Sequence, residues 1–421
     1  MIDVLTAIVT PPHLSVSGAG RAAERLSAAL ASRCNITVAS MMSPATYDRG
    51  ARHLPVRTRL PFGAPWSCIP NRYRTPFYRS DIAVHVQPDV YDIVHLHNPM
   101  PALELRRIAA ACRRAGIPYV ISTHGFNEIA GGGDVYGFGI LRRLLWRFLI
   151  YRPVAQVVRH ADAVMLLTPA DAAIVRGMGF RGDLMPILSN GTEPPAPIPP
   201  GVLTEVLLKF DVTKRDPAQL TCLFLANHTP NKGLPVLFRT FASLEIPFLL
   251  IVGGERRSGI DYDGFARSLK KGQRVIVTGR LRDEEIAVLM RRADLFVFPT
   301  LADTQPLVVY EALAAGLPVV ASRVGGIPYQ IDEGCGVLVP PGNSIALASA
   351  IESLAADRPR LHAMSTAAAA RGAQLMTWDD AATTARAVYE TVLAARRASR
   401  SGHRRPNVPG AGSEPAVRVL S

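Results

Sequence analysis

Short apolar runs alternate with longer amphipathic stretches along the whole chain. In the first half, the apolar runs predict strands at Val4–Val9, Ile36–Ala39, Ile93–Leu96, Tyr119–Ser122, Ala163–Leu167 and Leu184–Leu188. Between them, hydrophobic positions recur with helical spacing at Arg21–Leu30 and Pro101–Ala115. Strands that alternate with helices in this way are typical of a parallel sheet with helices on both faces.

The same rhythm restarts after residues 194–201, a segment so rich in proline that it continues neither a helix nor a strand and predicts a stiff linker. The strands expected beyond it are Cys222–Ala226, Phe248–Val252, Arg274–Thr278, Asp294–Phe298, Val319–Ala321 and Gly336–Val339. The expected helices are Leu234–Ala242, Asp283–Arg291, Leu307–Ala315, Ser344–Leu354 and an alanine-rich one at 378–396.

The two series of alternating strands and helices predict an α/β protein with two Rossmann-like, doubly wound domains that face a central cleft. Ligands of such sheets bind at the carboxyl ends of the strands, so we expect the site between the domains. The expected division is an N-terminal domain over 1–193, the linker over 194–201, a C-terminal domain over 202–377, a helix over 378–398 that packs back towards the first domain, and a disordered basic tail over 399–421.

The composition is that of a globular protein, with 48% hydrophobic and 19% charged residues among 421. A formal net charge of +13 favours anionic partners. We expect no nucleic acid partner, because neither a zinc-finger pattern nor an RNA-binding aromatic signature occurs. The scattered cysteines, the first residues without a basic signal-peptide region, and the lack of a membrane-spanning apolar run predict a cytoplasmic protein.

Gly18 and Gly20 belong to a segment with the letters of the G-x-G-x-x-A dinucleotide fingerprint. Eight residues separate this segment from the preceding strand, and no acidic residue closes the second strand, which argues against a dehydrogenase. What remains is a glycine loop that opens a helix, where backbone amides can face a phosphate or a sugar. A tight turn needed only for packing is the alternative.

Two sets of residues could bind a metal, and we expect neither to do so. His95 and His97 lie on one face of a strand, but no third ligand of suitable type is evident. Asp261 and Asp263 have the letters of a D-x-D motif, but they open a helix and are better explained as capping residues. His124 follows the next strand, where it could hydrogen-bond a sugar hydroxyl or simply anchor its loop.

Two segments of the second half suit a nucleotide diphosphate. Lys232 opens a helix just after a strand, where its charge would add to the helix dipole in holding phosphates, although a solvated lysine is the alternative. Pro306 is expected as the first residue of a later helix, whose first amides can donate hydrogen bonds to phosphate oxygens. Asp303 and Glu311 flank this helix start, which suits a ligand with hydroxyl groups at both ends, as in a nucleotide sugar.

In order along the chain, these segments resemble the retaining glycosyltransferase family 4 (glycosyl transferases group 1), whose members have the two-domain GT-B fold. The resemblance extends from Val4 to about residue 395. Its segments are Ser17–Arg21, His95–His97, Thr123–Gly125, Ser189–Glu193, Pro230–Gly233, Thr278–Gly279, Asp303–Glu311, Gly316–Ala321, Gly325–Pro328 and Val337–Gly342. Each one is a modest signal, whereas the ordered set is specific.

The resemblance implies transfer of a sugar from a nucleotide-diphosphate sugar, with retention of configuration and without an obligatory cofactor or metal. Lys232 would bind the diphosphate, Glu311 the ribose and Asp303 the donor sugar, with His124 beside the transferred sugar; these four are the expected catalytic residues. The other residues expected to contact donor or substrate are Gly18, Gly20, Asn227, Gly253, Gly279, Arg280, Pro306, Leu307 and Val308.

Two positions depart from the family pattern. Asn227 stands where the family usually has an arginine, so one phosphate-binding charge is missing unless His228 or Arg323 replaces it. Asp303 replaces the first glutamate of the family's E-x7-E motif, which keeps the carboxylate but shortens its reach. Both changes bear on the identity of the donor more than on the class of reaction.

The expected acceptor is a glycan, a lipid-linked glycan or a small metabolite, as in polysaccharide or glycoconjugate biosynthesis. Residues 140–150 combine arginines with leucine, tryptophan and phenylalanine, as an interfacial helix does, which would allow peripheral attachment to the anionic inner face of the cell membrane. A core helix whose arginines reach solvent is the alternative. A nucleotide-sugar epimerase of the same fold and a weakened sugar-binding assembly partner are the alternative functions.

Overall fold

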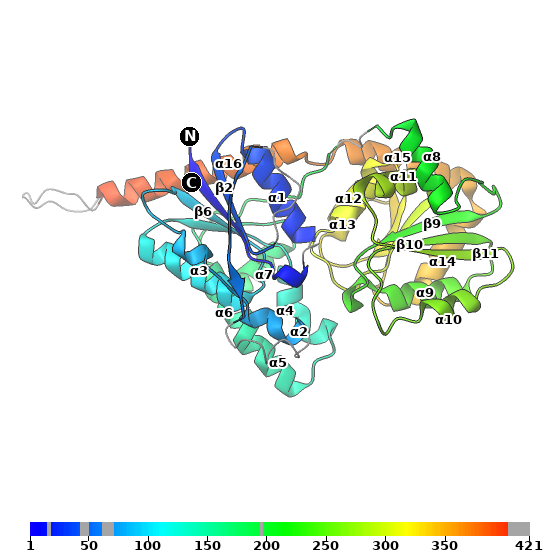
Figure 1. The fold of residues 1–421 in the computed structure, drawn as a ribbon, viewed down its shortest axis with the longest axis horizontal. Coiled ribbons are helices and arrows are strands. Elements are labelled where there is room, and N and C mark those ends of the chain that lie inside the picture. Colours follow the sequence, from blue (N-terminus) through cyan, green and yellow to red (C-terminus); the bar gives the residue numbers. More distant parts are fainter. Residues whose placement is uncertain (15–17, 43–49, 61–70, 194–196, 403–421) are drawn as a thin grey trace, which may run out of the picture.

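The computed structural model describes residues 1–14, 18–42, 50–60, 71–193 and 197–402, which form two α/β halves side by side (Figure 1). Residues 194–196 of the expected linker and residues 403–421 of the expected basic tail lie outside this described part. None of the described helices is both long enough and apolar enough to cross a bilayer.

The first half is built on a sheet of six parallel strands in the order β3-β2-β1-β6-β7-β8. These are β1 (Asp3–Ile8), β2 (Asn35–Ser40), β3 (Arg52–Leu54), β6 (Ile93–His97), β7 (Tyr119–Ser122) and β8 (Ala163–Met165), beside a small antiparallel pair, β4 (Thr58–Arg59) and β5 (Arg79–Ser80). Its α-helices are α1 (Gly18–Leu30), α2 (Asn71–Arg74), α3 (Ala102–Ala115), α4 (Phe126–Val135), α5 (Ile140–Trp146), α6 (Arg152–Arg159) and α7 (Asp171–Gly177), with a π-helical turn, η5 (Arg147–Tyr151), between α5 and α6.

The second half repeats this plan with the strand order β11-β10-β9-β12-β13-β14. Its strands are β9 (Leu220–Leu225), β10 (Phe248–Gly253), β11 (Gln273–Gly279), β12 (Leu295–Phe298), β13 (Val319–Ser322) and β14 (Gly336–Val339). Its helices are α8 (Pro200–Lys209), the short η6 (Pro230–Lys232), α9 (Leu234–Ser243), α10 (Tyr262–Arg267), α11 (Asp283–Arg292), α12 (Leu307–Ala314), α13 (Ile327–Gln330), α14 (Ser344–Ala356) and α15 (Arg358–Ala373). Counted from its own first strand, each sheet has the order 3-2-1-4-5-6 of doubly wound folds, which confirms the predicted fold class.

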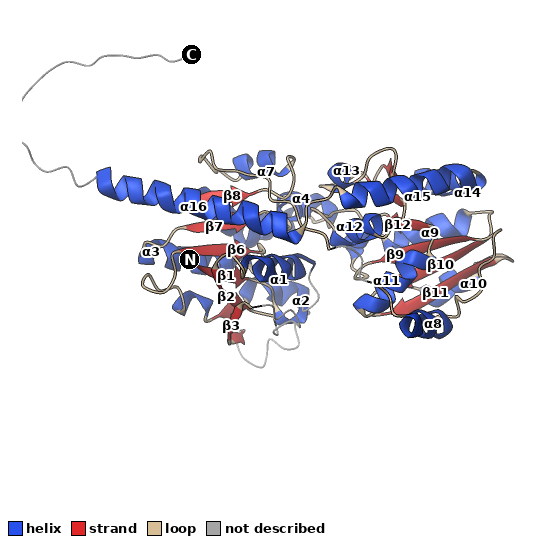
Figure 2. Ribbon diagram, turned by 90° about the horizontal axis from the view of Figure 1, so that it is seen from above, coloured by secondary structure: helices blue, strands red, loops and turns tan. Residues whose placement is uncertain are grey.

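The last helix, α16 (Trp378–Gly402), belongs to the first sheet and not to the second (Figure 2). It packs along α1, and its inward face joins the apolar cluster of that sheet face through Trp378, Ala381, Ala382, Ala385, Val388, Tyr389 and Val392. The opposite face of the same sheet is covered by α3 and α6. The C-terminal segment therefore completes the N-terminal domain.

The chain consequently passes between the domains twice, and the two passages lie side by side. Thr192 forms an isolated parallel bridge with Thr377, and its amide donates to the carbonyl of Met376 over 2.8 Å. A Cβ atom on Gly191 would lie 2.4 Å from the backbone nitrogen of Trp378, so only glycine allows this approach. The connection between the domains is thus a paired segment.

Three expectations are wrong in detail. Leu184–Leu188 forms only a single bridge to Leu166, although the Leu188 amide still donates to the Leu166 carbonyl over 2.7 Å, because Pro186 has no amide hydrogen to continue the ladder. The linker ends at Pro199, since Pro200 begins α8, a position that tolerates proline. The last helix continues through 399–402, where the disordered tail was expected to start. Elements that the sequence did not predict include β3, α8 and α15.

Candidate functional site

Residues that follow strands of one sheet contact residues that follow strands of the other. The amide of Gly125, after β7, donates to Oγ1 of Thr304, after β12, over 3.1 Å. Nδ2 of Asn127, in the first turn of α4, donates to the carbonyl of Asp303 over 2.6 Å. Because parallel strands end at one edge of their sheet, these bonds bring the two carboxyl edges together. We call this region the junction.

Gln305 is the most extensively bonded residue of the junction that sequence analysis did not single out. Its Oε1 accepts from the amide of Asn190 over 2.7 Å, and its carbonyl accepts from Nδ2 of Asn190 over 3.1 Å. Its Nε2 donates to the carbonyl of Leu167 over 3.0 Å and to Oγ of Ser189 over 2.9 Å. The buried side chain of Gln305 thereby joins Leu167, just after β8, and residues 189–190 to the start of α12.

Lys232 lies inside the junction and forms an ion pair with Asp303 through Nζ and Oδ2. The turn that places it ends at Gly233, whose φ is 74° and where a Cβ atom would lie 1.8 Å from the carbonyl oxygen of Pro299. Nζ of Lys232 also lies 5.9 Å from the centre of the Phe298 ring. Both charged side chains are largely buried, at 22% and 16% exposure, so Lys232 is not the solvated lysine of the alternative interpretation.

The start of α12 lies directly beyond Asp303. Pro306 is the N-cap of this helix, with φ −67° and ψ 123°, and not its first residue. The helix begins at Leu307, as the range Leu307–Ala315 predicted. Leu307 and Val308 therefore form the first turn, where amide hydrogens point out of the helix end. The helix start and Lys232 thus lie together, where the first amides of α12 and the ammonium could both donate to phosphate oxygens.

Two ion pairs join α1 to the C-terminal domain. Arg25 lies 3.6 Å from Glu311 on α12, measured between NH1 and Oε1. Arg21 lies 3.2 Å from Asp283 at the start of α11. Glu311 therefore faces the junction from the exposed side of α12, but in this structure its carboxylate is engaged by an arginine of the other domain.

His124 is part of a row of three buried histidines. The ring centres of His97 and His124 are 5.7 Å apart, and those of His95 and His97 are 3.8 Å apart. Burial lowers the pKa of His124 to about 4 and that of His95 to about 3. Burial also lowers the pKa of His97 well below its usual value. These imidazoles are uncharged at neutral pH, so His124 can act there through hydrogen bonds and not through charge.

Of the two histidines considered as metal ligands, His95 has other partners. His95 shares hydrogen bonds of 2.8 Å with the Tyr389 hydroxyl of α16 and with Oγ of Ser122. Asp261 caps α10 by accepting from the Gly264 amide over 2.7 Å, which agrees with the capping interpretation. The described residues contain no group of three or more histidine, cysteine, aspartate or glutamate side chains arranged to hold a metal ion.

Glu128 is an acidic junction residue that the sequence did not reveal. Burial raises the pKa of its carboxyl, and Lys232 and Asp303 are close enough to influence it electrostatically. The Tyr136 hydroxyl donates to its Oε1. No local motif marks it in the sequence, because the charges that act on it, those of Lys232 and Asp303, come from the other domain.

Asn227, at the position of the missing arginine, is exposed beside buried His228. Nδ1 of His228 shares a 2.7 Å hydrogen bond with the Tyr262 hydroxyl, and burial lowers its pKa, so this histidine does not supply the missing positive charge. A second basic residue, Arg257, acts on this region. After burial, its charge also lowers the pKa of His228. It likewise lowers the pKa of His13 in the N-terminal domain, where burial and Arg74 have the larger effects.

The predicted glycines lie at strand and helix ends. A Cβ atom on Gly253, the last residue of β10, would lie 2.4 Å from Cδ2 of Leu225, so a larger residue would displace the strand end. Gly279 closes β11 with φ 74° and leads into exposed Arg280. Gly18 opens α1 with open space around its Cα, and Gly20 is buried in the same turn. Residues 15–17, just before them, lie outside the described part.

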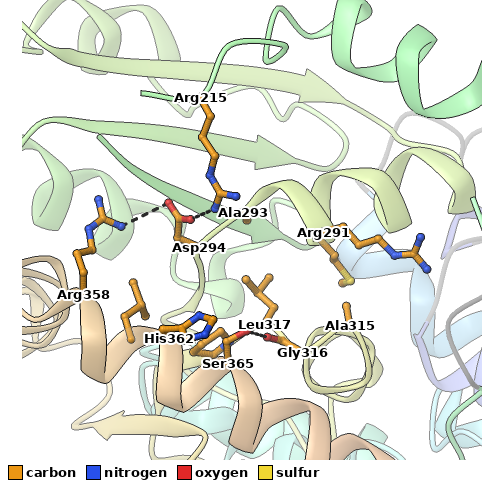
Figure 3. A pocket seen from close by; sticks show the side chains of 13 residues that line it. Arg215, Arg291, Ala293, Asp294, Ala315, Gly316, Leu317, Arg358, His362 and Ser365 are labelled. Atoms are coloured by element: carbon orange, nitrogen blue, oxygen red, sulfur yellow. Dashed lines mark hydrogen bonds and ion pairs between the residues drawn. The ribbon is translucent and has the colours of Figure 1, made fainter. Parts of the chain in front are cut away.

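A hollow of about 320 Å³ in the C-terminal domain is remote from the junction (Figure 3). It lies at the amino edge of the sheet, where Asp294 precedes β12. Asp294 forms ion pairs with Arg215 and, at 3.7 Å, with Arg358, and it accepts from the Thr221 amide over 2.9 Å. These groups satisfy one another and hold the sheet edge to α15.

Both halves of the chain match known families. Residues 17–191 match the family described as glycosyl transferase 4-like domain, and residues 219–357 match glycosyl transferases group 1. The D-inositol 3-phosphate glycosyltransferase of Streptomyces avermitilis is 28% identical over 338 residues, which cover 75% of this chain and 69% of that protein. The protein of the same name from Mycobacterium bovis is 28% identical over 336 residues, covering 76% of this chain and 65% of that protein.

Solved structures share the fold at lower identity. Sucrose-phosphate synthase from Thermosynechococcus elongatus superposes with a TM-score of 0.70 at 20% identity, covering 93% of this chain and 100% of that one. Anabaena HepE, solved with UDP and glucose, gives a TM-score of 0.67 at 18% identity, covering 96% and 100%. WaaG, a glycosyltransferase of lipopolysaccharide biosynthesis, gives a TM-score of 0.68 at 19% identity, covering 91% of this chain and 99% of that one. With both domains matched in sequence and architecture, this chain belongs to the glycosyl transferases group 1 of the family 4 type and is a glycosyltransferase with the GT-B fold.

Proposed function

We propose that the protein transfers a sugar from a nucleotide-diphosphate sugar with retention of configuration. The observation that carries this proposal is the Lys232–Asp303 pair at the start of α12, opposite His124 and Gly125 in the junction. A diphosphate would compete with Asp303 for Lys232, and its oxygens would accept hydrogen bonds from the first amides of α12. A structural relative in this fold, HepE, was solved with UDP-glucose, which supports a nucleotide sugar as the donor.

In this proposal the departing nucleotide diphosphate is stabilised by Lys232 and by the α12 amides, so transfer has no obligatory metal. Fixed donors aimed at the charge that develops in the transition state lower the barrier without reorganisation. Uncharged His124 would hydrogen-bond a hydroxyl of the transferred sugar, and Asp303, freed from Lys232, would accept from another. The Glu311 carboxylate would release Arg25 and accept hydrogen bonds from the ribose hydroxyls.

We assign the charge that Asn227 cannot supply to Arg257. Its charge acts on His228, the neighbour of Asn227, and on His13 of the N-terminal domain, and its amide donates to the Tyr262 hydroxyl that also bonds His228. Arg257 has an acidic neighbour, Glu255, but at 3.7 Å and with both side chains well exposed this pair is weak. A diphosphate would be a stronger partner for Arg257 than Glu255 is.

For the acceptor, the relatives named D-inositol 3-phosphate glycosyltransferase make a small phosphorylated polyol the first compound to test. A lipid-linked glycan is favoured by a different observation, the apolar surface of α5. Its side chains Ile140, Leu141, Leu144, Leu145 and Phe148 of the following turn are 83%, 71%, 48%, 50% and 53% exposed. Trp146 points the other way, since its Nε1 donates to the carbonyl of Ile129 over 3.0 Å.

We therefore also propose that α5 rests on an anionic membrane surface. Exposed Arg142 and Arg147 alternate with these apolar residues, and the guanidinium of Arg152 lies 4.6 Å from the centre of the Phe148 ring. An apolar face flanked by arginines matches the acyl and headgroup layers of an anionic bilayer. A helix with these residues exposed does not fit the alternative of a core helix.

The experiment that tests the reaction is incubation of the purified protein with a panel of nucleotide sugars and with the acceptors named above, with and without a chelator. Proton NMR of the product reports the anomeric configuration. Retained configuration and chelator-resistant transfer are expected. An inverted product, or activity that needs an added metal, would refute the corresponding part of the proposal. Inversion at the sugar C2 without transfer would indicate the epimerase, and binding without turnover the assembly partner.

A further inference from the structure

A groove lined by arginines runs along the outer surface of the N-terminal domain between α3 and α6, which pack side by side (Figure 1). Its volume is about 530 Å³. The basic residues that line it are Arg79, Arg106, Arg107, Arg113, Arg159 and His160. Its floor is formed partly by small residues of α3, Ala109 and Ala110, which leave the space between the helices open.

The groove has cations along its whole length. Arg106 and Arg113 lie seven residues apart on α3, which places them on one face of the helix about 10 Å apart along its axis. Arg159, in the last turn of α6, supplies a cation from the opposite wall. A ligand lying between the helices would therefore meet guanidinium groups on both sides.

Among the residues that the structure describes, the acidic side chains near this group are already engaged. Asp81 accepts from the Arg57 amide, and Asp162, which also accepts from the Tyr119 amide, pairs with Arg396. Glu104 is completely buried and accepts from Arg107 over 2.7 and 2.9 Å, and from the amide and hydroxyl of Ser80 over 3.1 and 2.7 Å. In the described part of the chain, no carboxylate lies within ion-pair distance of Arg106, Arg113 or Arg159. Arg106 has only a neutral partner, Oε1 of Gln156, at 3.4 Å.

Helix stability alone does not explain this arrangement. Cations in the last turn of a helix interact favourably with its dipole, which accounts for Arg113 and Arg159. Arg106 lies in the second turn of α3, where the dipole offers a positive charge no favourable interaction. Three unneutralised guanidinium groups around one groove also repel one another, and an anion would relieve that repulsion.

The groove is separate from the junction. Its far end lies at Tyr119, the first residue of β7, and at His160, which precedes β8, so it reaches the amino edge of the sheet. The junction lies at the carboxyl edge. We propose that this groove is a second anion site, which binds a ligand with two or more phosphate oxyanions through the forked guanidinium groups of Arg106, Arg113 and Arg159. A soluble polyphosphorylated metabolite and a phospholipid headgroup share this chemistry.

The test is hydrogen–deuterium exchange measured by mass spectrometry on the full chain, because it locates binding. The probes are inorganic pyrophosphate, phosphatidylcholine vesicles, and the same vesicles with added phosphatidylglycerol. The groove variant combines Arg106→Gln, Arg113→Gln and Arg159→Gln. The matched control combines Arg181→Gln, Arg239→Gln and Arg267→Gln, which removes the same charge at exposed positions elsewhere.

We expect slower exchange in residues 106–113 and 156–160 of the wild type and of the control, and at least about tenfold weaker protection of these segments in the groove variant, since each lost contact is charge-assisted. Protection by pyrophosphate would identify a soluble ligand, and protection only by anionic vesicles a headgroup; either result supports the site. No protection by either probe, or equal protection in the groove variant, would overturn it. If the triple variant melts early, Arg106→Gln alone serves, because this side chain is exposed and makes a single weak hydrogen bond.

Discussion

Lys232 is the residue with the clearest part in the proposed chemistry, because its ammonium is held in the junction by Asp303 until a diphosphate arrives. We expect Lys232→Ala to lower kcat/KM for the donor by about a hundredfold or more, the loss typical when one preorganised transition-state donor is removed. Steady-state kinetics with the active nucleotide sugar measures this. Exposed Lys271→Ala is the matched control. Undiminished activity in folded Lys232→Ala protein would refute the diphosphate assignment.

Arg257 should behave differently from Lys232, since we assign it to binding of the donor phosphates at the position that Asn227 leaves uncharged. Arg257→Gln is expected to weaken nucleotide diphosphate binding about tenfold, the cost of one charge-assisted contact. Calorimetric titration with the nucleotide diphosphate measures the affinity. Arg267→Gln, an exposed arginine of the same domain, should bind as the wild type does. Equal affinity of both variants for the nucleotide diphosphate would refute the assignment of Arg257 to the donor phosphates.

The three buried histidines make the stability of the N-terminal domain depend on pH. The pKa of His124 is about 4 and that of His95 about 3 in the folded state, below the usual 6.5 of the unfolded chain. Between these values the unfolded chain binds more protons, so stability falls as pH falls through that window. Each of the two should cost about 2 kcal/mol at pH 5 relative to neutral pH.

Urea unfolding at a series of pH values, followed by a probe in the N-terminal domain, measures this dependence. His124→Gln should flatten the slope between pH 7 and pH 5 even if it lowers stability overall, whereas exposed His362→Gln should leave the slope unchanged. A wild-type slope of zero in that range would mean that the histidines are not kept uncharged by burial.

At the scale of elements, α5 separates the two interpretations of the arginine-rich segment. We expect the protein to sediment with vesicles that contain phosphatidylglycerol, and the triple change Ile140→Ser, Leu141→Ser and Phe148→Ser to reduce the bound fraction at least about tenfold, because each change removes apolar area from the inserted face. Binding by this variant equal to that of the wild type would refute the proposal. Trp146 is left unchanged, since it packs on α4 and its loss would disturb the fold.

The control for this experiment replaces other exposed apolar residues, with Val84→Ser, Leu208→Ser and Ile345→Ser. These side chains are 68%, 64% and 81% exposed and belong to separate elements. They remove a comparable apolar area without touching α5. Sedimentation of this control should match that of the wild type.

The elements also show what the sequence could and could not predict. Long apolar strands such as β9 and β10 were predictable because both faces are buried and the pattern is continuous. The short β3 at the sheet edge, with an exposed and two half-buried residues, has no such pattern. Lys232 and Asp303 were found because local motifs carry them. Glu128, Arg257 and Gln305 were not, because their significance depends on groups brought near them from elsewhere in the chain.

The whole molecule depends on α16, which returns from the C-terminal domain to cover the first sheet. Tyr389 is completely buried there and bonds His95, the first residue of the histidine row. Tyr389→Ala should destabilise the N-terminal domain by about 3–5 kcal/mol, as for other large buried aromatic residues. Urea unfolding with a probe in each domain measures it, and Tyr329→Ala, 47% exposed, is the control. Equal stability in both variants would mean that α16 is not part of that core.

The position of α16 in the chain also has a consequence for biosynthesis. The N-terminal domain leaves the ribosome first, but a strip of its core arrives only with the last helix. The C-terminal domain, whose core comes from one continuous stretch, has all its residues available earlier. Translation therefore finishes the second domain before the first. During that interval, the apolar face of α1 lacks the helix that covers it in the folded protein.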